Sequence, residues 1–367
     1  MPFLSLTPYN FRNLQNKVID LCAKEVFFCG KNGQGKSNIL ETLYYSSYGS
    51  SFRTRYDSET VKKGETSMSI HSIYREECGI THTTNVKIDK NRKTIEKDGK
   101  VIHDRKELIN TMPCVLYNHD DLSFAVGEPE RRRFFIDQSL SMYDLVYIDT
   151  QRNYKKILKN RNLILKEQKY DLLDMYDMQL VKSGLEIQEK RSKAIFQFNQ
   201  IFGRLYQDIT GIDGVSIKYS PSWKKKDNGS CENEEFYILS CIKNKRDAEK
   251  VMCSTLSGPH RDRITFVRDG SDFVSTASTG QRRLIALILR TAQAVYYNQI
   301  TGKKPVLLMD DVMLELDPEK RQKLTALLPE YEQLICTFLP GEPYKNYMRE
   351  STIVYSVENG KLEVCNG

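Results

Sequence analysis

The chain has 367 residues, of which 40% are hydrophobic and 28% charged, and its formal net charge at neutral pH is +7. This composition predicts an ordered protein with a full hydrophobic core and enough chain for two lobes. There is no run of eighteen apolar residues and no basic N-terminal region followed by a long apolar one, so we expect neither a membrane span nor a secretory signal.

Cysteine usage and charge give weaker indications. The nine cysteines include no C-x-x-C pair, which favours reduced thiols and a cytoplasmic protein over disulfides or a zinc site. The excess of basic residues is compatible with a polyanionic partner, although an excess of this size also occurs in proteins that bind no nucleic acid.

The opening third of the chain reads as short strands. The strand candidates are residues 3–7, 26–29, 68–74, 83–88 and 93–96. Asp98 and Gly99 form a hairpin-turn pair beside the last of these runs.

A glycine-rich loop follows the apolar run 26–29 and precedes a helix-like stretch, 38–43. The loop is Gly30-Lys31-Asn32-Gly33-Gln34-Gly35-Lys36-Ser37, a complete G-x-x-x-x-G-K-S pattern, and Asn38 follows it. Glycines allow backbone N–H groups to turn inward onto phosphate oxygens at the positive end of the next helix. In such a loop Lys36 neutralises the β- and γ-phosphates and Ser37 ligates Mg²⁺. The pattern therefore predicts a site for a nucleoside triphosphate, against the alternative of a plain glycine turn.

From about Glu128 the pattern becomes helical and stays so to Ile209. An apolar stripe at helical spacing runs from Val181 to Ile209 and is interrupted by Gln188 and Ser192. We expect two or three antiparallel helices, with the stripe packing inside a helical lobe rather than facing a partner. Residues 224–230 are predicted to be a disordered loop, and His260 a turn residue rather than a catalytic base.

A second glycine-containing segment precedes a strong helix pattern over 282–298. It is Ser278-Thr279-Gly280-Gln281, in which Ser278 is suited to cap the helix. A helix start of this kind can bind an anion. Since the first loop already surrounds the phosphates of one nucleotide, we expect this segment to serve the nucleotide of a neighbouring chain.

An apolar run, 305–309, ends in two acidic residues, Asp310 and Asp311. It is predicted to be a buried parallel strand. Alternation along a strand places the two carboxylates on opposite faces, so that Asp310 holds Mg²⁺ while Asp311 polarises the attacking water. Glu315-Leu316-Asp317 lies where a subunit-contacting loop is expected. The run 334–337 is a further strand candidate whose end could approach the γ-phosphate.

The order of phosphate loop, S-x-G-Q segment and strand with paired acids resembles the ABC-type ATPases, and further motifs resemble the RecF family of bacterial repair proteins. Those motifs are residues 10–13, 30–38, 49–54, 120–122, 130–137, 256–262 and 307–317. The resemblance runs nearly end to end. Two departures are Asn118-His119, where the family usually carries Pro and Glu, and Arg263, which replaces a common acid after Asp262.

The resemblance implies an α/β fold: an ABC-type P-loop ATPase head, with a mixed sheet and an antiparallel β subdomain, and an inserted α-helical lobe. The expected division is 1–122 and 212–367 for the two parts of the head and 123–211 for the lobe. It also implies an ATP-dependent homodimer in which Lys36, Ser37 and Asp310 of one chain and residues 278–281 of the other bracket each nucleotide. In that arrangement the catalytic group comprises Asp311, Lys36, Ser278 and Gln281.

In function, the resemblance implies a slow, DNA-stimulated ATPase with ATP and Mg²⁺ as cofactors. Such proteins bind duplex DNA near single-strand gaps and work with RecO and RecR to help RecA replace single-strand-binding protein. Asp311 stands where most ABC enzymes have glutamate, and a shorter side chain would hold the water less well. Slow turnover would suit a switch.

The sequence offers candidates for DNA contact without choosing among them. Arg131, Arg132 and Arg133 form the densest basic cluster, of which at most two can face outward because Phe134 and Phe135 share their helix. Lys155 and Lys156, with Lys159 and Arg161, are predicted to cover one helix face, as a phosphate track or as an ordinary wet surface. Arg53 is a candidate for contact with the nucleotide or across the dimer.

Three rival interpretations compete with this one. A transporter's nucleotide-binding subunit would share the ATP motifs but would not need the helical insertion. An SMC-type protein would need heptads over hundreds of residues between Gly30 and Ser278, which the spacing excludes. A DNA-binding scaffold would use the nucleotide only to hold its dimer together.

Overall fold

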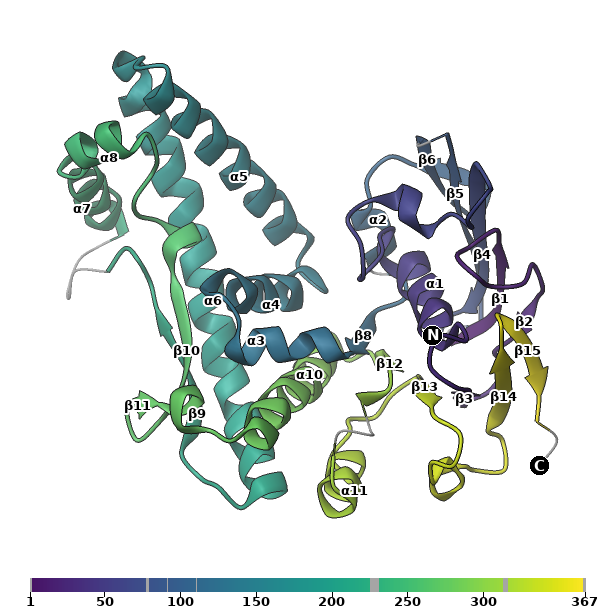
Figure 1. Ribbon diagram of the computed structural model, residues 1–367. Helices are drawn as coiled ribbons and strands as arrows, with labels where there is room; N and C mark the ends of the chain where they lie inside the picture. The colour runs from purple at the N-terminus through teal and green to yellow at the C-terminus, as the bar shows by residue number, and fades with distance from the viewer. Residues whose placement is uncertain are drawn as a thin grey trace. The chain divides into compact units, whose positions relative to one another are not determined.

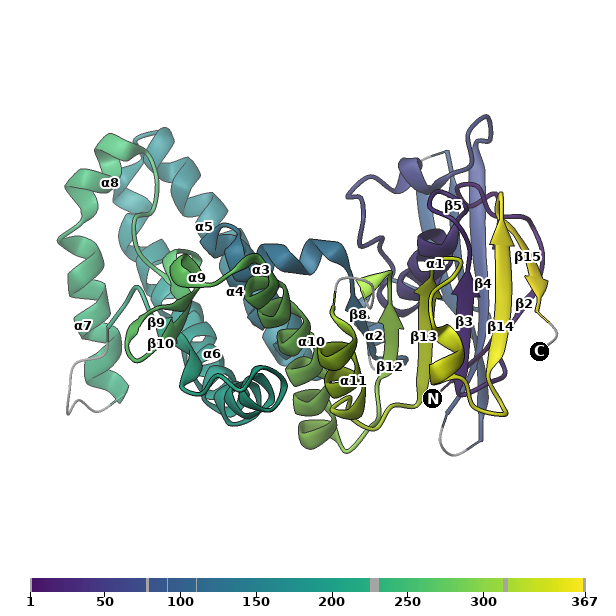
Figure 2. The same ribbon diagram turned by 60° about the horizontal axis from the view of Figure 1, so that its bottom comes forward.

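The computed structural model describes residues 2–76, 79–90, 92–109, 111–224, 231–312 and 316–365. Its chain forms two compact units, one built from residues 1–121 and 287–367 and the other from residues 122–286 (Figures 1 and 2). The first unit is thus assembled from the two ends of the chain, and the second from the middle.

The first unit contains two six-stranded sheets. The mixed sheet has the order β15-β14-β3-β13-β12-β8. Its strands are β3 (Glu25–Cys29), β8 (Cys114–Tyr117), β12 (Val306–Met309), β13 (Gln333–Phe338), β14 (Ile353–Glu358) and β15 (Lys361–Val364). All of these pairs are parallel except β14 with β15. The central strands are buried along their whole length, as apolar runs in a covered parallel sheet should be.

The second sheet of this unit is antiparallel, with the order β2-β1-β4-β5-β6-β7. Its strands are β1 (Phe3–Tyr9), β2 (Ile19–Asp20), β4 (Ser67–Arg75), β5 (Thr81–Asp89), β6 (Arg92–Lys97) and β7 (Lys100–Ile102). Buried and less buried residues alternate along β4. Asp98 and Gly99 both have positive φ between β6 and β7, which confirms the predicted hairpin turn.

The core of the first unit joins both sheets through α1 (Lys36–Tyr48). Ile39, Leu40 and Leu43 of this helix are fully buried in one cluster with residues of the mixed sheet, such as Phe28, and of the antiparallel sheet, such as Ile70. The helix that follows the glycine-rich loop is therefore fixed on both sides. The remaining helices wholly within the unit are α2 (Lys106–Ile109) and α11 (Pro318–Ala326), with 3₁₀ turns at Asp57–Thr60, His119–Asp121 and Tyr344–Tyr347.

The second unit is mainly helical. It comprises α3 (Leu122–Val126), α4 (Pro129–Ser141), α5 (Leu145–Lys166), α6 (Leu173–Thr210), α7 (Cys231–Lys243), α8 (Arg246–Met252), α9 (Phe273–Thr276) and two 3₁₀ turns, Tyr170–Leu172 and η4 (Pro259–Arg261). A small antiparallel sheet, β11-β10-β9, lies against α6 and comprises β9 (Val215–Ser220), β10 (Arg263–Arg268) and β11 (Ser271–Asp272). Helix α10 (Thr279–Thr301) begins in this unit and ends in the first.

The predicted apolar stripe forms the buried face of α6, from Val181 to Ile209. Gln188, which interrupts it, is also buried and donates to the Asp262 carboxylate at 2.7 Å. The expectation that the stripe packs within a helical lobe is confirmed. The predicted loop at 224–230 falls almost entirely outside the described residues.

Arg161 corrects the predicted basic face of α5. The prediction placed it on one exposed helix face with Lys155, Lys156 and Lys159, as a phosphate track or a wet surface, but its side chain is fully buried. Its guanidinium donates to Asp177 and Glu249, both at 2.6 Å, and to the Thr255 hydroxyl at 2.8 Å. Net charge and spacing alone could not reveal this, because the two acids come from α6 and α8.

None of the described helices is long and apolar enough to span a bilayer.

Candidate functional site

The glycine-rich loop lies where three parallel strands end. It connects β3 to α1, and β3 pairs with β13, which in turn pairs with β12. Because these strands are parallel, their carboxyl ends meet at one edge of the sheet, which is where open α/β sheets bind ligands. The loop, the end of β13 at Thr337 and the acids after β12 are thereby brought together.

The loop's glycines are required by its geometry. Gly33 and Gly35 have φ of 79° and 114°, in the region that a β-carbon disfavours. A β-carbon on Gly30 would overlap the carbonyl oxygen of Val357 in β14. Gly35 is also the N-cap of α1, and it has no side chain that could cap the helix start. The positive end of α1 is therefore left for an anion.

Three hydrogen bonds that the sequence did not indicate hold the loop and the start of α1 from outside. The Gln34 carbonyl accepts from the Gly360 N–H at 2.8 Å, and the Gln34 side chain accepts from the Asn359 N–H at 2.7 Å. On the other side, Asn38 of α1 donates to the Asn13 side chain at 2.7 Å. Asn13 belongs to the motif at residues 10–13, and residues 359–360 form the turn between β14 and β15. Nothing in the sequence near either position indicates that it contacts the glycine-rich loop or α1.

The side chains of Lys36 and Ser37 point toward the two acidic residues that follow β12. The Lys36 ammonium, on a side chain that is 3% exposed, donates to the Gly30 carbonyl at 2.8 Å and lies 3.6 Å from an Asp311 oxygen. Ser37 donates its hydroxyl to Asp310 at 2.8 Å. Ser37 and Asp310 are 273 positions apart in sequence, and together they form a hydroxyl and carboxylate pair. Oxygen ligands of this kind are the ones that Mg²⁺ prefers.

Asp310 and Asp311 differ from the alternation expected for a strand. Strand β12 ends at Met309, and Asp311 has a φ of 52°, so its carboxylate does not turn to the opposite face. Both carboxylates instead lie within reach of the Thr337 hydroxyl, at 3.2 Å for Asp310 and 2.9 Å for Asp311. Burial, together with the neighbouring Asp311 charge, raises the pKa of Asp310. The two carboxylates therefore lie on the same side of the sheet edge, next to the glycine-rich loop.

Arg53 lies at the rim of the same site. Its guanidinium donates to the Asn38 side chain at 2.6 Å and lies 3.5 Å from the buried carboxylate of Glu41. Arg12 binds the same carboxylate through two bonds, at 2.6 and 2.7 Å. Since Glu41 is on α1 behind the loop, the two arginines fix α1 from its side.

The S-T-G-Q segment belongs to the second unit. The Gln281 side chain accepts from the Ser278 N–H at 2.7 Å, and the Ser278 hydroxyl accepts from the Gln281 N–H at 3.2 Å. These two bonds form a reciprocal capping box at the start of α10, as the predicted Ser278 cap requires. Thr279 and Gly280 are exposed in its first turn.

The basic candidates for DNA contact have unequal surroundings. Arg131 is exposed, whereas Arg132 donates to the carbonyls of Ala125 and Ile264 and Arg133 to that of Asp262. Lys155 and Lys156 are exposed on α5. DNA contact by all five residues stays a prediction, and for Arg132 the structure provides an internal role.

The site's residues fit a nucleoside triphosphate with a divalent cation. Lys31, Asn32 and Gly33 are exposed on the loop, the α1 start has no side-chain cap, and one lysine and two carboxylates converge there. Lys36 would neutralise phosphate charge, and Ser37 and Asp310 would supply oxygen ligands to Mg²⁺. The bound pair would supply a phosphoanhydride bond and a cation to polarise it.

Known proteins share this fold and this sequence pattern. The model of the RecF/RecN/SMC N terminal domain matches residues 4–363. A solved structure of the recombination mediator protein RecF with ATP, in the RecFOR pathway, superposes with a TM-score of 0.90 at 26% identity, covering 100% of this chain and 98% of that one. An SMC head bound to the C-winged helix domain of ScpA gives a TM-score of 0.56 at 15% identity, and shows the fold alone.

The fold and the site thus define an ABC-type P-loop ATPase head with a helical lobe, as predicted. Among curated relatives, the DNA replication and repair protein RecF of Treponema pallidum is 46% identical over 357 residues, which cover 97% of this chain and 99% of that protein. RecF of Clostridium perfringens is 32% identical over 364 residues, covering 98% and 99%. The chain belongs to the RecF family.

Proposed function

We propose that the chain is an ATP-dependent recombination mediator in DNA repair and replication. It would bind duplex DNA near single-strand gaps and act with RecO and RecR to help RecA replace single-strand-binding protein. The observation that carries this proposal is the convergence of Lys36, Ser37 and Asp310 on one loop, in a chain whose relatives at 46% and 32% identity are named DNA replication and repair proteins.

The ATP site is proposed to be shared between two copies of the chain. Residues 30–38, with Asp310 and Asp311, would come from one copy, and residues 278–281 from the other. Support comes from the exposed S-T-G-Q helix start, because its capping box leaves the first turn of α10 free to meet an anion. ATP would then act as the contact between the copies, and the ADP-bound chain would separate.

Hydrolysis is proposed to be slow and stimulated by DNA, so that the ATPase acts as a switch. Asp311 would polarise the attacking water, but its carboxylate also lies 3.6 Å from the Lys36 ammonium and accepts from the Thr337 hydroxyl. A carboxylate engaged in these two contacts is a weak general base. A slow chemical step follows from that environment.

Sedimentation with ATP, with ADP and without nucleotide, each with and without a gapped duplex, tests the proposal. Dimers that form only with ATP and co-sediment with the duplex are the expected result. ATP turnover measured in parallel distinguishes the scaffold alternative, which predicts dimers on DNA with turnover no higher than the blank. Monomers under all conditions would contradict both.

A further inference from the structure

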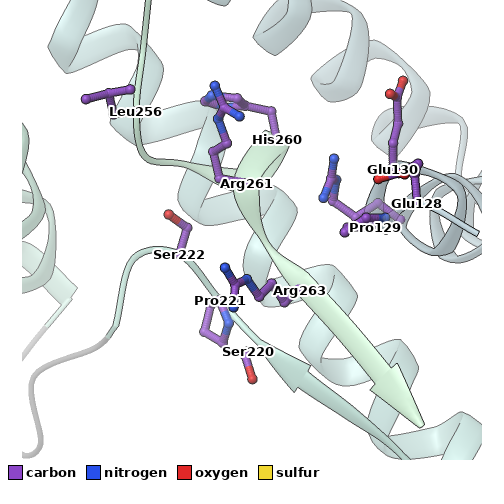
Figure 3. Close-up of a pocket in the computed structure, with 11 residues that line it drawn as sticks. Glu128, Pro129, Glu130, Ser220, Pro221, Ser222, Leu256, His260, Arg261 and Arg263 are labelled. Carbon is purple, nitrogen blue, oxygen red and sulfur yellow. The ribbon is translucent and has the colours of Figure 1, made fainter. Parts of the chain in front are cut away.

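A cavity of about 680 Å³ lies within the second unit, and none of its lining residues is assigned to the nucleotide (Figure 3). It opens between the start of α4, the end of β9 and the segment that joins η4 to β10. Its lining residues are Glu128, Pro129, Glu130, Arg133, Ser220, Pro221, Ser222, Leu256, His260, Arg261 and Arg263.

Two exposed arginines, Arg261 and Arg263, project from the segment on either side of Asp262. Asp262 is fully buried, and its carboxylate accepts from Gln188 and the Ser222 N–H, both at 2.7 Å. It accepts further from Arg191 at 2.9 Å and from the Tyr219 hydroxyl at 2.6 Å. Because four donors occupy it, this acid cannot serve the arginines beside it. It fixes their backbone instead.

The guanidinium groups of Arg261 and Arg263 have no hydrogen-bond or ion-pair partner among the residues that the structure describes. On the facing wall, Arg133 is held in place by its bond to the Asp262 carbonyl at 2.8 Å. The α4 start, with Pro129 in its first turn, also lines the wall and has no side-chain cap. The guanidinium groups of Arg133, Arg261 and Arg263 therefore surround one space.

Three arginines outnumber the two acidic residues that also line the cavity. Glu128 and Glu130 are exposed at the rim, and Glu130 extends away from Arg261 and Arg263 in Figure 3. His260 is neutral at physiological pH, because burial lowers its pKa to about 4. Its two ring nitrogens are engaged by the Tyr154 hydroxyl at 2.7 Å and the Thr255 carbonyl at 3.2 Å.

We propose that this cavity is a phosphate-binding site for the backbone of duplex DNA, with Arg261 and Arg263 as its contact residues and Arg133 as a supporting charge. Guanidinium forks match phosphate oxygens, and contacts of this kind are independent of base sequence. The inference rests on the proposed DNA binding and names where that binding occurs.

The test compares duplex affinity over a range of salt concentrations for the full chain and two variants. In the double variant Arg261→Gln/Arg263→Gln we expect affinity to fall roughly tenfold or more, since each lost contact is a charged hydrogen bond. The slope of log affinity against log salt should fall by about 0.9 for each lost phosphate contact. Arg204→Gln on α6, whose side chain is 84% exposed, is the matched control and should bind like the wild type.

The results for the double variant and the wild type distinguish this inference from the proposed function. Wild-type affinity and slope in the double variant, with DNA binding intact, would overturn this inference and leave the proposed function standing. No duplex binding by the wild type would overturn both. Thermal stabilisation of the wild type, but not the double variant, by millimolar inorganic phosphate, combined with unchanged DNA binding, would assign the cavity to a small phosphorylated ligand instead. Unchanged melting temperatures without ligand verify that the variants fold.

Discussion

At the scale of single residues, Lys36 is the side chain on which ATP binding is expected to depend most. Its ammonium is held by the Gly30 carbonyl and faces Asp311, within a loop whose backbone is shaped by its glycines rather than by this side chain. Lys36→Ala should therefore leave the fold intact and weaken ATP binding by at least about a hundredfold, since it removes charged hydrogen bonds to phosphate.

Calorimetric titration with ATP measures the Lys36→Ala effect. Lys31→Ala is a matched control, because Lys31 is an exposed lysine of the same loop whose backbone, not its side chain, is assigned to the nucleotide. Equal affinity of Lys36→Ala and the wild type would show that the loop does not bind phosphate as assigned.

His260 gives a prediction for stability against pH. Its pKa is about 4 in the folded chain against an ordinary 6.5, so between these values the unfolded chain binds the extra proton. The stability associated with neutral His260 is thus fully present above pH 6.5 and is lost as pH falls toward 4. The loss amounts to at most about 3 kcal/mol.

Unfolding by denaturant at pH 7.5 and pH 5 should show the loss for the wild type, while His260→Gln should show a smaller change between the two pH values. Identical pH dependence of the two proteins would mean that other groups are responsible.

The residues recoverable from the sequence are those whose neighbours in the chain define their role. Lys36 and Ser37 sit in a local pattern, and Asp310 ends a recognisable strand. The end of the run 334–337 was expected near the γ-phosphate, but the contacts of Thr337 with the two acids and of Asn13 with Asn38 could not be predicted, because they come from the packing of distant elements. The shared face of Asp310 and Asp311 depends on one left-handed residue, which strand alternation cannot predict.

At the scale of elements, the helical lobe depends on a buried charge. Arg161 of α5 pairs with Asp177 of α6 and Glu249 of α8, and all three side chains are fully buried. Arg161→Leu would leave the Glu249 carboxylate without its cation, whereas Asp177 keeps its ion pair with Arg246. Removing one partner of a buried pair costs about 3–5 kcal/mol. We expect the unfolding free energy of the lobe to fall by that amount.

Urea unfolding followed by far-UV circular dichroism measures this change. Lys159→Leu on the exposed face of the same helix should change stability by less than about 0.5 kcal/mol and serves as the control. A similar small effect for Arg161→Leu would contradict the described network.

The start of α10 has two roles that one substitution separates. Ser278→Arg removes the hydroxyl of the capping box, which costs about 1 kcal/mol, and puts a bulky cation at the proposed contact with the partner's nucleotide. We expect this variant to bind ATP but not to dimerise. Ser278→Thr keeps the hydroxyl and should dimerise. Normal ATP-dependent dimers of Ser278→Arg in sedimentation would refute the role between chains.

Most of the strands and helices could be predicted from the local sequence pattern, but the hairpin β14–β15 was missed. The predicted strands at 26–29 and 305–309 are β3 and β12, and the helix pattern at 282–298 lies within α10. The hairpin β14–β15 was not predicted, although Asn359-Gly360 is a strong turn signal. Its role, holding Gln34 of the glycine-rich loop, arises only when β14 pairs with β3.

At the scale of the whole molecule, the central claim is that each ATP site needs two chains. The glycine-rich loop and the paired acids lie in the unit formed by the chain ends, and the S-T-G-Q helix start lies in the other unit. A chain with a defective loop and a chain with a defective helix start should therefore complement each other, because one site in the mixed dimer combines the two intact halves.

The most direct measurement is DNA-stimulated ATP turnover of Lys36→Ala and Ser278→Arg, separately and mixed in equal amounts. The account predicts that each variant alone is inactive and that the mixture regains turnover, together with ATP-dependent dimers, up to about half the wild-type number of sites. A mixture as inactive as its components, or normal turnover by Ser278→Arg alone, would contradict it.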